Sequence, residues 1–223
     1  EAERALQLNP EDAEAYNIIA NYHEFNGELE LAKKQEEEGL ARWPTYWSLR
    51  MHLGWILSDQ GDQAAAIREY EKVLEQDPQN ILMAPDISHS YLLAGNLGSA
   101  RNILEHARKE ERKNFYVRIA WALLLASEGN QLAARKEMDT EVLKYATLNP
   151  YADLWTAEFY AIVGERAKAL DWLDQGLRGG DERAETFSRD PLLASIHNEP
   201  RFKQILDSIA FHRQQRQAAQ TTP

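Results

Sequence analysis

Apolar residues recur along most of the chain at the i, i+3, i+4 and i+7 spacing of helices with one buried face. The spacing is interrupted at short polar stretches that contain glycine, such as Asn26-Gly27-Glu28 and Gln60-Gly61-Asp62. Glycine adopts the left-handed conformation that ends a helix without the steric penalty of a Cβ atom, so a second helix can begin a few residues later. The pattern therefore predicts pairs of helices joined by tight turns.

The predicted helix pairs repeat with a fixed period. A glycine followed five residues later by an alanine occurs five times, and successive glycines are 34, 34, 34 and 35 residues apart. The five pairs are Gly27/Ala32, Gly61/Ala66, Gly95/Ala100, Gly129/Ala134 and Gly164/Ala169. A small residue also recurs on each first helix, at Ala20, Gly54, Ser88, Ala122 and Ala157. Small residues on both helices of a pair let the two backbones approach closely, and we expect them where the helices cross.

This pattern resembles the tetratricopeptide repeat family, whose 34-residue helix-turn-helix unit has large, small, aromatic, Gly, Ala and Pro residues at fixed positions. The resemblance implies an all-α chain, a right-handed superhelical stack of helical hairpins (an α-solenoid) with a C-terminal helical cap. It predicts the tail of a preceding repeat, five repeats, capping helices and a polar tail that frays. The boundaries are 1–12, then 13–46, 47–80, 81–114, 115–149 and 150–179, then 180–213 and 214–223.

Two prolines, Pro85 and Pro150, predict departures from the regular repeat. Pro85 lies where the first helix of the third repeat should already be running, so we expect that helix to start late, with Pro85 in its first turn. The fourth repeat delays its closing proline to Pro150, which predicts a second helix about one turn longer than in the other repeats. The first helix of the fifth repeat should then be short.

The period is lost after Gly180, where Asp190-Pro191 and Asn198-Glu199-Pro200 have the capping residue followed by proline that begins a helix. We expect this segment to cover the last hairpin. It also resembles the closing segment of bacterial multidomain proteins in which a tetratricopeptide array follows an effector domain. The opening Glu1-Ala2-Glu3-Arg4 lacks a Met and predicts a piece cut from a longer protein. A sensor or adaptor role in a larger bacterial protein follows as an expectation.

Charge narrows the choice of partners. Lys and Arg number 25 against 36 for Asp and Glu, a net charge of −11, which disfavours nucleic acid and anionic membranes. Residues 1–40 hold eleven acids and three bases, whereas residues 201–223 hold four bases and one acid. A basic partner for the N-terminal end and head-to-tail self-association both fit this asymmetry, as does a plain solvated surface. Apolar stretches are too short to span a bilayer.

Candidate chemistry is sparse in this sequence. The chain has no cysteine, and its six histidines include no paired spacing typical of a zinc site. No phosphate-binding loop or nucleophile motif is present, so we expect no enzyme activity, no metal and no cofactor. Glu36-Glu37-Glu38 is expected to form a solvated face, because consecutive residues on a helix point in different directions. The compartment is left open, with the cytoplasm favoured over the periplasm.

The resemblance implies a concave groove lined by the second, fifth, ninth and twelfth positions of each first helix. Several of these positions are apolar or aromatic, which favours an apolar or amphipathic peptide. The predicted groove residues are Asn17, Asn21, Met51, Trp55, His89, Leu92, Tyr116 and Leu123. Only Asn21 matches the Lys, Asn and Arg set with which related modules hold chaperone tails, so that partner is disfavoured.

Two alternatives accompany the groove prediction. Met51, Trp55 and Leu92 could be covered by neighbouring hairpins, and His89 could be an ordinary surface or satisfied histidine. The predicted function is a non-catalytic protein-interaction module that binds a protein or peptide partner. The alternative function is a scaffold that forms homo-oligomers, for example a homodimer.

Overall fold

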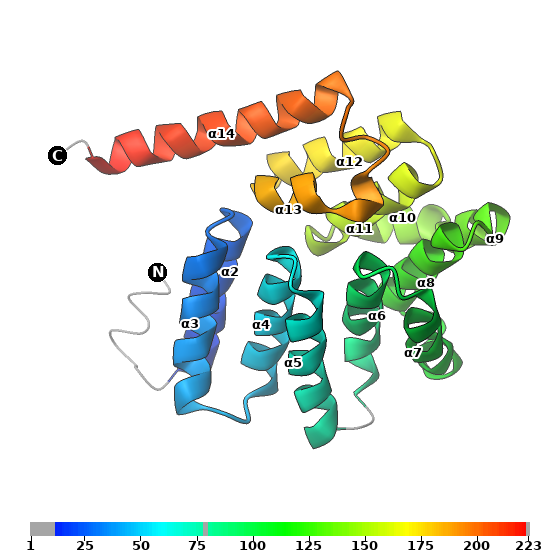
Figure 1. The fold of residues 1–223 in the computed structure, drawn as a ribbon, viewed down its shortest axis with the longest axis horizontal. Coiled ribbons are helices and arrows are strands. Elements are labelled where there is room, and N and C mark those ends of the chain that lie inside the picture. Colours follow the sequence, from blue (N-terminus) through cyan, green and yellow to red (C-terminus); the bar gives the residue numbers. More distant parts are fainter. Residues whose placement is uncertain (1–11, 78–79, 222–223) are drawn as a thin grey trace. The chain divides into compact units, whose positions relative to one another are not determined.

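The computed structural model describes residues 12–77 and 80–221, and within these ranges all regular secondary structure is helical (Figure 1). The prediction of an all-α repeat fold is thus confirmed. The chain divides into two compact units, Glu1–Arg112 and Lys113–Pro223. The division falls two residues before the predicted boundary between the third and fourth repeats. Residues 1–11 of the predicted N-terminal repeat tail lie outside the described residues.

The first unit is built from three helical hairpins that follow one another in chain order (Figure 1). The hairpins are α2 (Ala13–Phe25) with α3 (Leu29–Arg42), α4 (Trp47–Asp59) with α5 (Gln63–Gln76), and α6 (Ala84–Leu93) with α7 (Leu97–Glu110). Their turn glycines, Gly27, Gly61 and Gly95, have φ of 71°, 89° and 72°. Each glycine is therefore in the left-handed region that the sequence predicted, and it lets the second helix start four residues after the first ends.

Close approach of the two helices depends on the small residues. Ala20 and Ser88 on first helices and Ala32, Ala66 and Ala100 on second helices are fully buried. At Gly54 the helices cross so closely that an added Cβ atom would overlap the ring of Tyr70. A glycine is required there because the ring of Tyr70, itself buried, occupies the space of any side chain.

The third hairpin starts as Pro85 predicts. A short 3₁₀ helix, η1 (Ile81–Met83), precedes α6, and Pro85 lies at the N-terminal end of α6, where the missing N–H costs no helical hydrogen bond. α6 has 10 residues, whereas α2 and α4 have 13. Ser88 Oγ donates a hydrogen bond of 2.7 Å to the carbonyl oxygen of Pro85 and so helps to close this first turn.

The second unit contains two further hairpins and a C-terminal helical segment. Its elements are α8 (Phe115–Ser127), α9 (Gln131–Glu137), α10 (Thr140–Ala146), α11 (Tyr151–Ile162), α12 (Arg166–Arg178), α13 (Ala184–Arg189), η2 (Pro191–Leu193) and α14 (Pro200–Thr221). Turn glycines Gly129 and Gly164 again have positive φ, 84° and 81°. α11 has 12 residues, one fewer than α8, in line with the expected shortening.

The prediction of one longer second helix in the fourth repeat is wrong. That segment is divided into α9 and α10, with the break at Met138 and Asp139. The Asp139 carboxylate accepts hydrogen bonds from the backbone N–H groups of Glu141 and Val142, both at 3.1 Å, and so caps a new helix. Arg118 on α8 also donates to Asp139 at 2.7 Å. Sequence spacing gave the length of the segment, and the capping aspartate decides that it is two helices.

The C-terminal segment covers the last hairpin of the second unit. η2 packs against α11 and α14 packs against α12. Ser195 Oγ donates to the carbonyl oxygen of Ala161 at 2.8 Å, and Arg201 pairs with Asp171 at 2.6 Å and with Asp174. The Asp190 carboxylate caps η2, as the sequence predicted. α14 continues to Thr221, so residues 214–221 extend this helix instead of forming a frayed tail.

Candidate binding surface

Four of the predicted groove residues gather on two neighbouring first helices of the first unit. Asn17 and Asn21 lie on α2, Met51 and Trp55 lie on α4, and all four are partly exposed. α2 and α4 are in direct contact, and Asn17 Nδ2 donates a hydrogen bond of 2.7 Å to Oγ of Ser48. We call these four residues the α2–α4 surface.

The apolar part of this surface is anchored in the core. Met51 and Trp55 are one helical turn apart and pack against a buried cluster formed by the second and third hairpins. That cluster contains Leu53, Leu57, Ala66, Tyr70, Val73, Met83 and Ile87. A partly exposed side chain with a buried base is held in place before binding, which lowers the entropy cost of a contact.

The indole of Trp55 lies among ionisable groups. Its ring meets the His52 imidazole edge-on, with centroids 5.5 Å apart and planes at 87°. On α6, burial raises the pKa of Asp86 to about 7, against the lowering effects of the Trp55 indole and of His89. The charge of Asp86 next to Trp55 therefore changes within the neutral pH range.

Beneath the surface, His52 is held between two carboxylates. Its Nε2 lies 2.6 Å from Oε2 of Glu24, and its Nδ1 lies 2.5 Å from Oε1 of Glu36. All three side chains are buried, and they come from α4, α2 and α3 respectively. Burial by itself would lower the pKa of His52, but Glu24 and Glu36 raise it to about 10. The imidazole is thus a cation at neutral pH and donates an N–H to each carboxylate.

This triad fixes the first hairpin to the second. Burial raises the pKa of Glu36, and the hydrogen bond from His52 opposes that rise. The three side chains of the triad hydrogen-bond to one another. Within the described residues, no group of three or more His, Asp or Glu side chains is arranged to hold a metal ion. The network is a structural ion cluster between hairpins, and it supports the helix that carries Met51 and Trp55.

Sequence reasoning missed the triad and misplaced Glu36. Glu37 and Glu38 are exposed and pair with Lys33 and Lys34, one helical turn earlier. Glu36, in contrast, is fully buried. The expectation of a solvated face is therefore corrected for this residue. The repeat itself indicates that position 36 is buried, because Glu36 lies one period before Tyr70, which is a core residue.

Three predicted groove residues are buried. His89 in the first unit is 8% exposed and Leu92 is 2% exposed, while Leu123 in the second unit is 0% exposed. Side chains with so little exposed area belong to the core, so we correct the candidate contacts by removing these three. This agrees with the alternative that Leu92 is covered by its neighbours.

Tyr116 belongs to an aromatic cluster of the second unit. Its ring lies 5.7 Å from that of Tyr145 and 5.9 Å from that of Trp155, and its hydroxyl donates to Asn149 Oδ1 at 3.0 Å. It therefore lies in a different compact unit from the α2–α4 surface.

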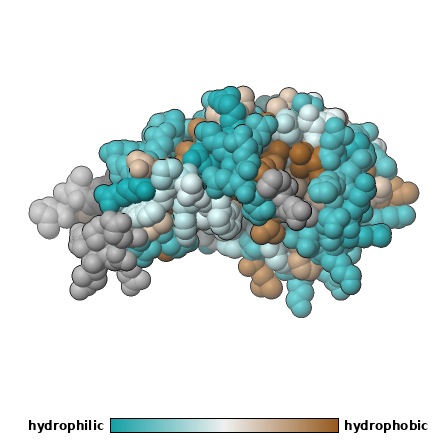
Figure 2. All heavy atoms as spheres, turned by 90° about the horizontal axis from the view of Figure 1, so that it is seen from below, coloured by the Kyte–Doolittle hydropathy of each residue, from teal (hydrophilic) through white to brown (hydrophobic). Residues whose placement is uncertain are grey.

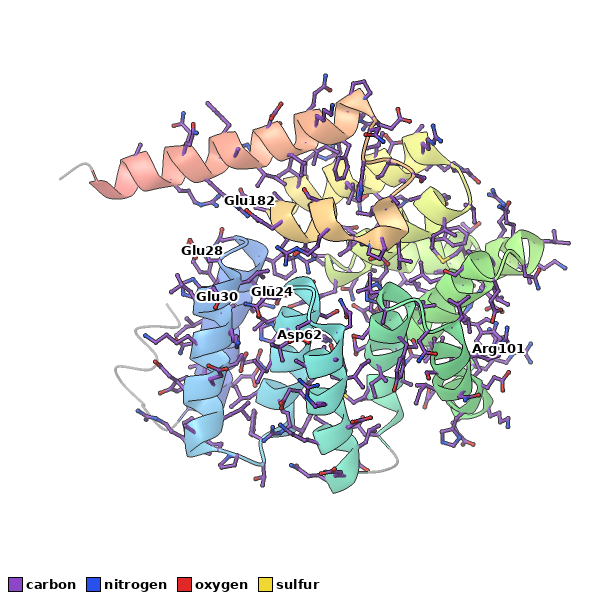
Figure 3. The ribbon with its side chains drawn as sticks, viewed as in Figure 1. Glu24, Glu28, Glu30, Asp62, Arg101 and Glu182 are labelled. Carbon is purple, nitrogen blue, oxygen red and sulfur yellow. The ribbon has the colours of Figure 1, made fainter. Side chains whose placement is uncertain are left out.

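Acidic side chains surround the hairpin turns of the first unit. Figure 3 shows Glu28, Glu30 and Asp62 at the turn ends of the first two hairpins. All three are exposed, and Glu30 Oε1 accepts a hydrogen bond of 2.8 Å from Gln60. The electrostatic field at this turn end of the unit favours a cationic ligand. Figure 2 is seen from below, away from these turns, and shows a largely hydrophilic face with apolar residues in small patches.

Known proteins share this repeat and fold. Residues 57–127 match the family model described as tetratricopeptide repeat. No curated protein matches the sequence. Over these residues the turn glycines and the helical hairpins agree with the tetratricopeptide repeat that the family model describes.

Solved structures show the same fold at low sequence identity. A chain of the APC/C hetero-tetramer Cut9–Hcn1 is similar with a TM-score of 0.63 and 13% identity, over 93% of this chain and 44% of that one. A tetratricopeptide repeat protein from Parabacteroides merdae is similar with a TM-score of 0.55 and 13% identity, over 94% of this chain and 90% of that one. PilF of Pseudomonas aeruginosa is similar with a TM-score of 0.52 and 18% identity, over 90% of this chain and 89% of that one. None of the described helices is both long and apolar enough to cross a membrane.

Proposed function

We propose that this chain binds a peptide segment of a partner protein on the α2–α4 surface. The observation that carries the proposal is the placement of Met51 and Trp55 one turn apart on α4, partly exposed above a packed core. α4 contacts α2, the helix that carries Asn17 and Asn21. Tetratricopeptide repeats are in general interaction modules, and the fold supports a protein or peptide partner.

The chemistry of the surface suggests an amphipathic and basic segment. Trp and Met side chains bury a large apolar area and often anchor a partner. The amides of Asn17 and Asn21 have the donors and acceptors that a peptide backbone needs. The exposed acids at the hairpin turns favour Lys or Arg in the same segment.

We further propose that the module acts as the sensor or adaptor part of a larger bacterial protein. Assembly with other chains occurs in a structural neighbour, which was solved as the hetero-tetramer Cut9–Hcn1. In this role the module would recruit a partner and leave any catalysis to another domain.

A homo-oligomerisation scaffold is the second candidate. The observation that favours it is the exposure of large apolar side chains at Ile18, Tyr22 and Leu31 in the first unit, together with opposite net charges at the two ends of the chain. Light scattering over a wide concentration range decides this point, because a scaffold gives a dimer or larger species and the peptide-binding module stays monomeric.

Selection from a displayed library of random dodecamer peptides tests the primary proposal. The unchanged chain should enrich peptides that combine aromatic or aliphatic residues with Lys or Arg. Trp55→Ala and Met51→Ala should lose most of this enrichment, and Leu132→Ala, at an exposed site in the second unit, should retain it. The proposal fails if no peptide class is enriched, or if the α4 variants select the same peptides as the unchanged chain.

A further inference from the structure

The second unit carries aromatic side chains that the proposal for the α2–α4 surface does not use. They come from three helices: Phe115 and Tyr116 from α8, Tyr145 from α10, and Tyr151 and Trp155 from α11. Four of these side chains are partly exposed, and Tyr151 is 38% exposed. We call these five residues the aromatic cluster. Large apolar side chains that are exposed together often mark a recognition surface.

Ring contacts join the cluster across the three helices. The rings of Phe115 and Tyr145 are stacked, with centroids 4.5 Å apart and planes at 17°. Tyr116 meets Tyr145 and Trp155 edge-on, at 5.7 Å and 5.9 Å. Tyr151 and Trp155 are four residues apart on α11, so they lie on the same side of that helix. The rings hold one another in place, which lowers the entropy cost of a contact with a ligand.

The cluster lies where the chain departs from its regular repeat. Tyr145 is on α10, the helix that the Asp139 cap separates from α9, and α10 contacts both α8 and α11. Asn149 lies between α10 and α11. The irregular segment thus brings Tyr145 and Asn149 to Tyr116, and it gives the second unit a surface that repeat positions alone do not describe.

Asn149 is the polar centre of this surface. Its Oδ1 accepts a hydrogen bond from the Tyr116 hydroxyl at 3.0 Å and from the backbone N–H of Tyr151 at 3.3 Å, so both lone pairs are used. Its Nδ2 donates one hydrogen to the Tyr145 hydroxyl oxygen at 2.9 Å. Among the described residues, the second hydrogen of Nδ2 and the hydroxyl hydrogen of Tyr145 have no acceptor.

This hydrogen-bond pattern selects the chemistry of a ligand. The acceptor of Asn149 is saturated and two donors are unused, so a matching ligand brings carbonyl oxygens and few N–H groups. A proline-rich peptide has this composition, because proline has no backbone N–H. In the polyproline II conformation its carbonyl oxygens make no internal hydrogen bonds, and such segments bind surfaces lined by aromatic side chains.

Charge separates this surface from the one on the first unit. Residues 113–155, which contain the aromatic cluster, hold five bases and five acids, whereas residues 1–40 hold eleven acids and three bases. A region without net charge does not attract a strongly charged peptide over long range. An uncharged, proline-rich segment therefore fits the cluster better than a basic or an acidic one.

We propose that the aromatic cluster of the second unit binds a proline-rich segment of a partner protein. Proline rings pack on Tyr151 and Trp155, and the Tyr145 hydroxyl donates to a carbonyl oxygen of the segment. The chain then has two peptide sites of different chemistry, one in each compact unit.

Titration of labelled peptides with the complete chain tests this proposal. A fluorescein-labelled decaproline peptide is the probe, and fluorescence anisotropy follows its binding. Control peptides of the same length alternate Gly with Ser, Leu with Glu, or Leu with Lys. The proposal predicts saturable binding of decaproline, and affinity for each control peptide at least about tenfold weaker.

Two variants test the assignment of the site. Tyr145→Phe removes one hydroxyl and keeps the ring, and Tyr151→Ala removes an exposed ring. Each should weaken decaproline binding at least about fivefold. Phe211→Ala, at an exposed aromatic residue of α14, is the matched control and should leave the affinity unchanged. Circular dichroism and the Tm show that each variant retains its fold.

Three results would overturn the proposal. The first is the absence of saturable decaproline binding. The second is equal or tighter binding of any control peptide, which would assign the surface to another ligand. The third is an affinity for decaproline that neither Tyr145→Phe nor Tyr151→Ala changes. Binding of basic amphipathic peptides through Met51 and Trp55 is measured independently, so the two proposals can fail separately.

Discussion

His52 lies between Glu24 and Glu36, with its ring nitrogens 2.6 Å and 2.5 Å from their carboxylate oxygens. The three residues belong to three helices, so one imidazole links the first hairpin to the second. Removing one partner from a buried ion cluster leaves uncompensated charge, whereas replacing the whole cluster with apolar residues is often neutral.

His52→Ala should lower the free energy of unfolding by about 3–5 kcal/mol, because two buried carboxylates lose their cation. The triple variant Glu24→Leu/Glu36→Leu/His52→Leu should recover most of this loss. Urea denaturation followed by circular dichroism gives both values. A single variant that costs less than about 1 kcal/mol would show that the triad does not carry charge in the folded chain.

The triad also predicts how stability depends on pH. The pKa of His52 is about 10 in the folded chain, above its unfolded value near 6.5. Its contribution is therefore complete below about pH 6.5 and is lost as pH rises toward 10. The Tm of the unchanged chain should therefore fall over this pH range, relative to the Tm of His52→Gln. Parallel pH profiles for the two proteins would contradict the assignment.

Trp55 should report the ionisation of Asp86. Burial raises the pKa of Asp86 to about 7, so its charge beside the indole changes near neutral pH. The fluorescence difference between the unchanged chain and Trp55→Phe should titrate with a midpoint near 7. Asp86→Asn should abolish the transition. A difference spectrum that stays constant from pH 5 to 9 would place the titration elsewhere.

Gly54→Ala should destabilise the chain by about 1–3 kcal/mol, because the new methyl group overlaps the buried ring of Tyr70. Gly98→Ala is the matched control on α7, where the nearest atom to a new Cβ is 3.9 Å away. The control should gain up to about 1 kcal/mol from helix propensity. Chemical denaturation compares the two, and equal effects would contradict the packing at Gly54.

The break between α9 and α10 depends on Asp139. Asp139→Ala should cost about 1 kcal/mol through loss of the helix cap. Asn130→Ala is the matched control, since Asn130 caps α9 by accepting from the N–H of Ala133 at 3.4 Å. The greater loss should be at Asp139, because Arg118 also bonds its carboxylate. Denaturation midpoints decide the order, and a greater loss at Asn130 would contradict it.

Much of this fold could be predicted because the repeat fixes both helix ends and helix contacts. Turn glycines such as Gly61 and small crossing residues such as Ala66 recur at one spacing, and each has a single physical role. The division of the fourth second helix could not be predicted from spacing. It depends on the side chain of Asp139 competing for backbone N–H groups, which is a local effect without a period.

The candidate surface could be predicted less completely than the fold. Position numbers within a repeat select Met51 and Trp55, which are partly exposed, and they equally select Leu92 and Leu123, which are buried. Exposure depends on what packs over a helix in three dimensions, and the repeat pattern contains only the contacts of neighbouring hairpins. The buried charges of Glu36 and His52 were missed for a related reason, since each is ordinary by itself and informative only as a pair.

Affinity measurement with a selected peptide tests the central claim most directly. The peptide is titrated calorimetrically into the unchanged chain, Trp55→Ala, Trp55→Phe and Leu132→Ala, each checked for an unchanged helical spectrum. Peptide binding on the α2–α4 surface predicts that Trp55→Ala weakens affinity at least about tenfold, that Trp55→Phe weakens it less, and that Leu132→Ala leaves it unchanged. Equal affinity for all four proteins would show that the peptide binds elsewhere and would contradict the account.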